Sequence, residues 1–192
     1  ARHCGFDIER HIFESTLDVP QFDEQRFAGA IARVESAGIR CFTLADLGDT
    51  EDARRALWDV ERLAARDIPG GSESSTRPFD VFERQVCQAA WYRPDAQIIA
   101  AAGDRWVGMT ALGYYASLQP FMWQMMTGVD PTFRGRGIAL ALKLLGIRCA
   151  ARYGAAYIRT NNDSENAPML AINRALGFRP EPGAYRMARD IP

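Results

Sequence analysis

The alternation of apolar and polar residues predicts several strands along the chain. Residues 8–19 partly alternate and lead to Pro20, a pattern typical of a strand with a stop. The other predicted strands are Ile39–Leu44, Gln97–Ala102, Trp106–Leu112, Phe121–Val129, Ala156–Thr160 and Tyr185–Asp190.

Apolar residues at helical spacing predict helices between these strands. One begins after Asp23 and runs to Ser36 before Gly38, and a second is capped by Asp49 or Thr50 and ends at the Ile68-Pro69 break. The remaining predicted helices are Phe79–Ala90, Gly135–Tyr153 and Glu165–Leu176. This mixed order predicts an α/β fold, an open mixed sheet with helices on both faces, rather than a barrel or a bundle.

Composition narrows the function classes. The 192 residues, 47% of them hydrophobic, suffice for one main domain. The net charge of -1 supplies no basic field for nucleic acid or an anionic membrane. The four cysteines are scattered, which argues against a zinc site or a disulfide framework. No apolar run reaches about 20 residues and no signal-peptide pattern opens the chain, so we expect a cytoplasmic protein. Its first residue, Ala1, suggests a fragment or a processed chain.

The stretch from Gly128 to Ala139 carries the most chemical information. Gly135 and Gly137 lie where a strand should turn into an apolar helix. Free N–H groups at a helix start, the helix dipole, and Arg134 and Arg136 together favour a pyrophosphate ligand. The alternative is an ordinary turn with two solvent-facing arginines. The spacing does not fit a P-loop, and Leu140 replaces the third glycine of a dinucleotide fingerprint.

The same stretch resembles a known family. Arg134-Gly135-Arg136-Gly137-Ile138-Ala139, preceded by Val129-Asp130-Pro131, is similar to the Arg/Gln-x-x-Gly-x-Gly/Ala signature of the GNAT acetyltransferases. Asn166-Ala167-Pro168-Met169 and Leu176-Gly177-Phe178 resemble a later helix of that family and its ending. The resemblance implies a mixed, mostly antiparallel sheet that splays apart between Phe121–Val129 and Ala156–Thr160. It also implies acetyl-CoA as the cosubstrate.

The resemblance further implies which residues bind acetyl-CoA. Backbone groups of Met126, Thr127 and Val129 would pair with pantetheine. The N–H groups of the turn would hold the pyrophosphate, from Arg134, Gly135, Arg136, Gly137, Ile138 and Ala139. Asn166 would position the pantetheine or its thiol end, unless it only begins a helix.

The chain departs from the family where catalysis is concerned. Asn173 stands where many members carry a tyrosine that protonates the departing thiolate, and an amide can only donate a hydrogen bond. The alternative is a polar residue on a solvated helix face. The strand Phe121–Val129 has no carboxylate to act as base, so the catalytic residues stay unknown. Strict alternation would put Trp123 and Met125 on one face of that strand and Met122, Gln124 and Met126 on the other.

The N-terminus suggests an internal repeat. His3-Cys4-Gly5-Phe6 followed by a strand resembles Ala175-Leu176-Gly177-Phe178 followed by a strand, although coincidence is an alternative. Residues 1–20 would then be the tail of an upstream GNAT copy, 21–38 a linker helix and 39–192 the GNAT domain. On this interpretation, the strand 8–19 should not take the usual first-strand place, which belongs to Ile39–Leu44.

These features predict an enzyme, an N-acetyltransferase that moves an acetyl group from acetyl-CoA to the amine of an unidentified small molecule or peptide. One alternative is a non-catalytic acyl-CoA-binding or regulatory module, and another is a partner-docking scaffold. We expect no metal, no nucleic acid and no membrane as partners. An upstream GNAT domain or a second copy of the chain is a candidate protein partner.

Overall fold

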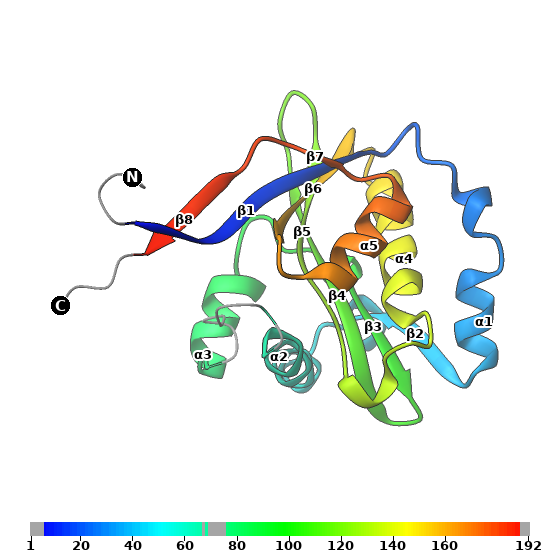
Figure 1. Ribbon diagram of the computed structural model, residues 1–192. Coiled ribbons are helices and arrows are strands. Elements are labelled where there is room, and N and C mark those ends of the chain that lie inside the picture. The colour runs from blue at the N-terminus through cyan, green and yellow to red at the C-terminus, as the bar shows by residue number, and fades with distance from the viewer. Residues whose placement is uncertain (1–5, 67, 69–75, 189–192) are drawn as a thin grey trace.

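The computed structural model describes residues 6–66, 68 and 76–188 (Figure 1). Within them, eight strands form one sheet in the order β2-β3-β4-β5-β6-β1-β7, with β8 paired to β1. Every pair is antiparallel except β5 with β6. The strands are β1 (Asp7–Asp18), β2 (Ile39–Thr43), β3 (Gln97–Ala102), β4 (Arg105–Tyr115), β5 (Phe121–Val129), β6 (Tyr157–Asp163), β7 (Arg179–Pro180) and β8 (Ala184–Ala188). The helices are α1 (Ala30–Ser36), α2 (Glu51–Ala65), α3 (Phe79–Phe82), α4 (Ile138–Arg152) and α5 (Ala167–Leu176).

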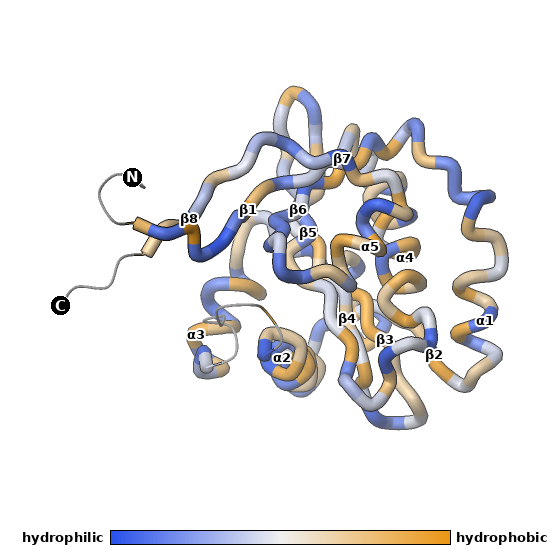
Figure 2. The backbone as a smooth tube through the Cα atoms, in the orientation of Figure 1, coloured by the Kyte–Doolittle hydropathy of each residue, from blue (hydrophilic) through white to orange (hydrophobic). Residues whose placement is uncertain are grey.

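Helices cover both faces of the sheet. In Figure 1, α1, α4 and α5 lie on one side and α2 and α3 on the other. The buried apolar residues accordingly form two clusters. The larger includes Leu142 and Leu144 of α4, and the smaller includes Leu57 of α2 and Phe82 of α3. In Figure 2, α4 is mostly hydrophobic along its length, whereas α2 has a mixture of hydrophobic and hydrophilic residues. The predicted α/β class, with its mixed and mostly antiparallel sheet, is confirmed.

Two predicted helices are broken or shortened in the structure, and glycine explains one of these differences. Asp23 caps only a short 3-10 turn, Glu24–Phe27, because Gly29 adopts φ +77° and interrupts the helix. The chain resumes as α1, whose Ala30 and Val34 are buried against the α4 side of the core. The helix predicted over Phe79–Ala90 is shorter. It runs as α3 and then a π-helical turn, Glu83–Cys87.

The strand β1 does not take the first place in the sheet. The predicted Ile39–Leu44 strand, observed as β2, forms the edge beside β3. Instead β1 lies between β6 and β7, with Leu17 opposite Ile158 and Thr16 opposite Arg179. This part of the sequence prediction is confirmed, although His3, Cys4 and Gly5 of the proposed repeat lie outside the described residues.

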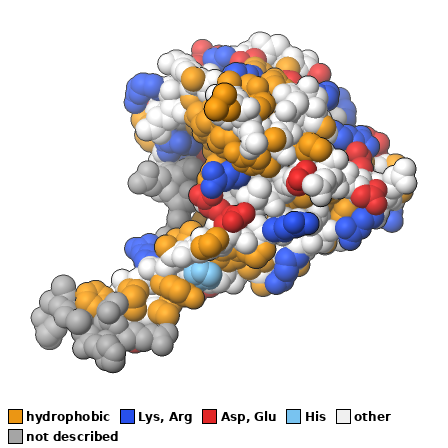
Figure 3. Space-filling model, turned by 90° about the horizontal axis from the view of Figure 1, so that it is seen from above, with side chains coloured by type: hydrophobic (Ala, Val, Ile, Leu, Met, Phe, Trp, Pro, Cys, Tyr) orange, Lys and Arg blue, Asp and Glu red, His pale blue; other side chains and the backbone are white. Residues whose placement is uncertain are grey.

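The outer half of β1 leaves the body of the sheet as a two-stranded ribbon with β8. Figures 1 and 3 show this ribbon projecting to one side. Its apolar side chains are poorly covered, since Ile8, Ile12 and Tyr185 are 40%, 39% and 60% exposed.

Three further predictions concern metal ions, membrane spans and the cysteines. Among the described residues, no cluster of three His, Cys, Asp or Glu side chains could hold a metal ion. No helix in the described ranges has the length and apolarity needed to cross a membrane. Cys41, Cys87 and Cys149 are free thiols, and burial raises the pKa of each to about 11.

Candidate functional site

The site is built around the point where β5 and β6 part. The two strands pair in parallel from Phe121 opposite Tyr157 to Gln124 opposite Thr160, and their pairing ends there. Beyond Gln124, β5 continues to Val129 along β4 alone. This opening confirms the splay that the family resemblance implied.

A bulge in β5 accompanies the parting. Ala111 of β4 pairs with Met126 and the next residue, Leu112, pairs with Gln124, so Met125 is an extra residue in β5. Strict alternation therefore fails here. The prediction that Met126 shares a face with Gln124 is wrong, because Met125 and Met126 both pack against the α2 side of the core. The bulge also moves Thr127 onto the face of Gln124.

The turn after β5 is shaped by Asp130. Its carboxylate accepts hydrogen bonds from the backbone N–H and hydroxyl of Thr132, at 2.8 and 2.7 Å, and pairs with Arg105 at 2.5 Å. These hydrogen bonds from Thr132, with the guanidinium of Arg105, hold the pKa of Asp130 below its usual value. The carboxylate thus stays ionised and fixes the start of the glycine-rich turn.

The turn ends in an uncapped helix start. Gly135 and Gly137 adopt φ +75° and +80°, a conformation that glycine tolerates best. Gly137 is the N-cap of α4, and no side chain caps it. The first intrahelical bond runs from the N–H of Ala141 to Gly137, so the N–H groups before it point out of the helix. The predicted start at Gly135 is therefore three residues early.

No acidic side chain occupies the first turn of α4. The helix dipole places about half a positive charge there, and acidic residues commonly offset it. This end is thus an electropositive group of backbone donors suited to an anion.

A cavity of about 580 Å³ lies against this helix start. Its walls come from α2, β5, the turn, α4 and α5, so it reaches from the helix start into the splay. The predicted binding residues that line it are Thr127, Val129, Arg134, Gly135, Gly137, Ile138, Ala139 and Asn166. The structure therefore brings most of the predicted residues together around one cavity.

Three predicted residues lie outside this lining. The carbonyl of Met126 already accepts hydrogen bonds from Thr110 and Gln124. Arg136 is exposed, donates to the carbonyl of Thr132 and lies over the ring of Phe133.

Asn173, the third, is 3% exposed, which excludes the solvated-face alternative. Its Nδ2 donates to Oδ1 of Asn162 at 2.8 Å, and Asn162 donates to the hydroxyl of Ser15 on β1. Its own Oδ1 has no partner among the described residues.

Asn166 begins α5 and also stands on the cavity wall. Its side chain accepts a hydrogen bond from the N–H of Met169 at 3.3 Å and so caps α5. The helix begins at Ala167 for this reason, two residues later than predicted. Asn166 also lines the cavity.

Sequence reasoning missed the contribution of α2. Ala64 and Ile68 line the cavity opposite Gly128, and a Cβ on Gly128 would lie 2.2 Å from that of Ala64. The absence of a side chain at Gly128 thus lets α2 approach β5. Glu165, a carboxylate at the rim, was also missed.

A buried lysine is the least expected feature. Lys143 of α4 is 2% exposed, and its Nζ donates to Oε1 of Gln124 at 3.3 Å. It lies 5.1 Å from the ring centre of Phe178. None of the described carboxylates forms an ion pair with it, and burial lowers its pKa to about 7. The apolar run of α4, within which this lysine sits, could have flagged it.

Comparison with known proteins agrees with this geometry. No protein-family model matches the chain. A GCN5-related N-acetyltransferase from Sphaerobacter thermophilus superimposes with a TM-score of 0.66 at 19% identity, over 97% of this chain and 52% of that one. A tandem GNAT protein from the clavulanic acid biosynthesis pathway does so with a TM-score of 0.59 at 19% identity, over 94% of this chain and 53% of that one.

The chain has the GNAT fold. Curated relatives are N-acetyltransferases too. The mycothiol acetyltransferase of Nocardioides sp. is 25% identical over 194 residues, covering 93% of this chain and 60% of the relative. The N-alpha-acetyltransferase RimI of Mycobacterium tuberculosis is 35% identical over 81 residues, covering 42% of this chain and 49% of the relative. The GNAT fold described here thus spans about half to three fifths of the length of these relatives.

Proposed function

We propose that this chain is an acetyl-CoA-dependent N-acetyltransferase domain. The observation that carries the proposal is the uncapped start of α4, with positive φ at Gly135 and Gly137, which opens into a cavity that reaches the splay between β5 and β6. The N-acetyltransferase names of the relatives support the same reaction.

The described residues suggest how acetyl-CoA would lie. Its pyrophosphate would accept hydrogen bonds from the N–H groups of Ile138 and Ala139, near the guanidinium of Arg134. Its pantetheine would run along the part of β5 that has left β6, at Thr127 and Val129, although the Val129 carbonyl also accepts a hydrogen bond from Nε of Arg134 at 3.1 Å. Asn166 would form the far wall of the cavity. The thioester would then stand where the strands rejoin, at Gln124 and Thr160.

The reaction itself needs a neutral amine. Its nitrogen would attack the thioester carbon, the C–N bond would form, and the C–S bond would break to release the CoA thiolate. A thiolate is a tolerable leaving group, because its conjugate acid has an ordinary pKa of about 8.5. A dedicated acid in place of Asn173 is therefore not required.

The acceptor class is open between two kinds of amine. One relative is named a mycothiol acetyltransferase and the other an N-alpha-acetyltransferase. The test is calorimetry with acetyl-CoA, followed by thiol release measured with aminoglycosides, amino acids, polyamines and peptide N-termini. Failure to bind acetyl-CoA would refute the proposal.

A second candidate is a non-catalytic acyl-CoA-binding module. Asn173 in place of a phenol, and the absence of a carboxylate on β5, favour it. Tight acetyl-CoA binding without thiol release for any amine would select this candidate.

We also propose that residues 1–20 belong structurally to the end of an upstream GNAT copy, with 21–38 as a connecting segment and 39–192 as the domain. The position of β1 between β6 and β7, and the tandem nature of one structural relative, support this division. The ribbon of β1 and β8 would then face the upstream copy or a second chain. Light scattering, which measures mass in solution, would reveal a dimer.

The free thiols support a cytoplasmic location.

A further inference from the structure

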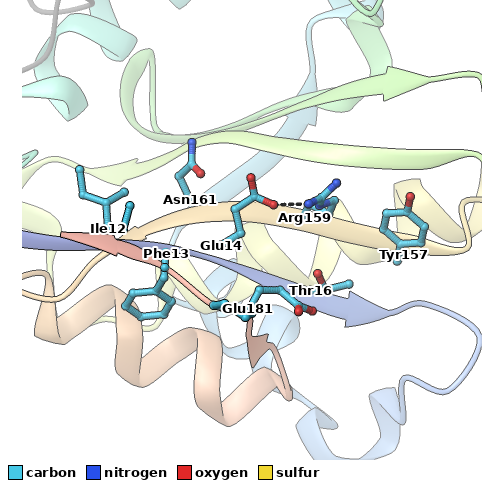
Figure 4. Close-up of a pocket in the computed structure, with 11 residues that line it drawn as sticks. Ile12, Phe13, Glu14, Thr16, Tyr157, Arg159, Asn161 and Glu181 are labelled. Carbon is cyan, nitrogen blue, oxygen red and sulfur yellow. Dashed lines mark hydrogen bonds and ion pairs between the residues drawn. The ribbon is translucent and has the colours of Figure 1, made fainter. Parts of the chain in front are cut away.

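A second cavity lies on the sheet face that bears α2 and α3. It has a volume of about 760 Å³ and lies over β1 and β6, beside the segment between β7 and β8. Its wall is part polar and part apolar, and the polar side chains are Glu14, Thr16, Tyr157, Arg159, Asn161 and Glu181. Figure 4 shows Glu14 and Arg159 pointing toward each other above the strands, with Asn161 beside them.

The strand register places Glu14 next to the splay. Thr160 is the last residue of β6 that pairs with β5, and Asn161 follows it. Glu14 is the direct partner of Asn161 across the antiparallel pair, so their Cα atoms are about 5 Å apart. Glu14 therefore stands one strand away from the point where β5 and β6 separate.

The first cavity lies in the splay between β5 and β6, with walls from α2, α4 and α5, and the second lies over β1 and β6 on the face that bears α2 and α3. Thr160 and Asn162 are buried on the side of α4 and α5, whereas Asn161 alternates to the opposite side and is exposed. Acetyl-CoA would enter from the helix start of α4, and a second substrate would meet it from the Glu14 side.

The ion pair with Arg159 orients the Glu14 carboxylate. Arg159 donates to it, and the guanidinium lies 5.6 Å from the ring centre of Trp123 on β5. The carboxylate of Asp163, which lies opposite Ile12 on β6, is paired with Arg10. The cavity wall carries the carboxylates of Glu14 and Glu181 against the one guanidinium of Arg159, a net charge of -1, which favours a cation.

We infer that Glu14 binds the ammonium group of the acceptor and takes its proton, and that the acceptor is a small primary amine without a carboxylate. This inference rests on the proposed acetyltransferase function. The ammonium would give one proton to Glu14, and the resulting amine would attack the thioester carbon. After the C–S bond breaks, the second proton of the amine nitrogen goes to the thiolate through water, and Glu14 returns its own proton to solvent.

The experiment compares Glu14→Gln with Glu9→Gln, a matched change on the same strand at a glutamate that pairs with Arg186 and does not line the cavity. The probes are glucosamine and kanamycin, which lack a carboxylate, and glycylglycine, which carries one. The wild-type protein should prefer the first two. Glu14→Gln should lower kcat/KM by about 100-fold or more, as loss of a general base does, with unchanged acetyl-CoA affinity. Glu9→Gln should stay within about fivefold, and Glu14→Asp should recover part of the loss.

Three outcomes separate the claims. If the wild-type protein turns over and kcat/KM of Glu14→Gln lies within about threefold of the wild-type value, the role of Glu14 is overturned and the proposed function stands. A wild-type preference for glycylglycine would overturn the acceptor class. Absence of thiol release from wild-type protein with every amine would refute the proposed function and this inference with it. Thermal unfolding and acetyl-CoA calorimetry on each variant would exclude misfolding as the cause.

Discussion

The side-chain amide of Asn173 on α5 donates a hydrogen bond to Oδ1 of Asn162 on β6, 2.8 Å away. Both side chains are buried, and Asn162 in turn donates to Ser15 on β1. Three elements are thus linked by one chain of polar contacts beneath the splay.

Replacing Asn173 by Ala should affect stability more than chemistry. The change leaves Oδ1 of Asn162 without its donor, which costs about 1–3 kcal/mol of unfolding free energy. Turnover should fall by about tenfold or less, because an amide supplies no proton. Denaturant unfolding and kcat measure the two effects, and Arg174→Ala, an exposed neighbour, serves as the control. A thousandfold loss of kcat with normal acetyl-CoA binding would show a chemical role that we have not identified.

A glutamate at Gly137 should abolish acetyl-CoA binding. Its carboxylate would repel the pyrophosphate at the start of α4, and its Cβ would occupy the approach to the N–H groups. Gly154→Glu is the matched control, since Gly154 has φ +63° at the other end of α4 and open space within 4 Å of the position that a Cβ would take. Both changes strain the backbone, so only a difference in calorimetric affinity reports on the site. Equal affinities for the two variants would remove the central claim.

Lys143 should contribute a rise in the stability of the protein with pH between about 7 and 8.5. Burial lowers its pKa to about 7 in the folded protein, against 10.5 in the unfolded chain. In this window the unfolded state binds more protons, so the unfolding free energy gains at most about 1.4 kcal/mol per pH unit from this group. The gain is lost as the pH falls through 7.

Lys143→Met isolates this effect. The variant should show a more shallow rise, or a steeper fall, of unfolding free energy with pH from 7 to 8.5. The buried cysteines, whose pKa is raised to about 11 in the fold, act in the opposite direction but equally in both proteins, so the difference between the two curves reports Lys143. Denaturant titrations at a series of pH values measure it. Parallel curves for the two proteins would mean that Lys143 stays charged in the fold.

Gly128→Ala should destabilise the contact between β5 and α2. A methyl group there would lie 2.2 Å from Cβ of Ala64 and 3.1 Å from its Cα, so α2 must shift. Overpacking of this kind costs about 1–3 kcal/mol. Chemical denaturation measures the loss, and the double variant with Ala64→Gly should recover part of it. If Gly128→Ala is as stable as the wild-type protein, α2 shifts to accommodate the methyl group without a loss of unfolding free energy.

Local patterns predicted the parts of the site that lie close together in sequence. Gly135, Gly137 and the apolar run behind them define the turn and helix within a dozen residues, and their conformation depends little on the rest of the chain. Asn166 also caps its helix through a bond to a residue three positions away. Such features can be read from one sequence.

Features that depend on pairing between distant segments could not be read in the same way. The extra residue at Met125 exists only relative to β4, and it inverted the predicted face of Met126. The contact of Gly128 with Ala64 joins positions 64 residues apart, and Glu14 faces Arg159 only because β1 lies beside β6. Sequence alternation carries no information on these partners.

The position of β1 has a consequence for how the protein forms. Residues Ile12–Asp18 pair with a strand about 140 to 150 positions later, and with the still later β7. Contacts of such long sequence separation close slowly. During synthesis, β1 would wait with open backbone edges until β6 leaves the ribosome. An unpaired edge of this kind invites pairing with other chains, so β1 is a strand at which assembly is exposed to error.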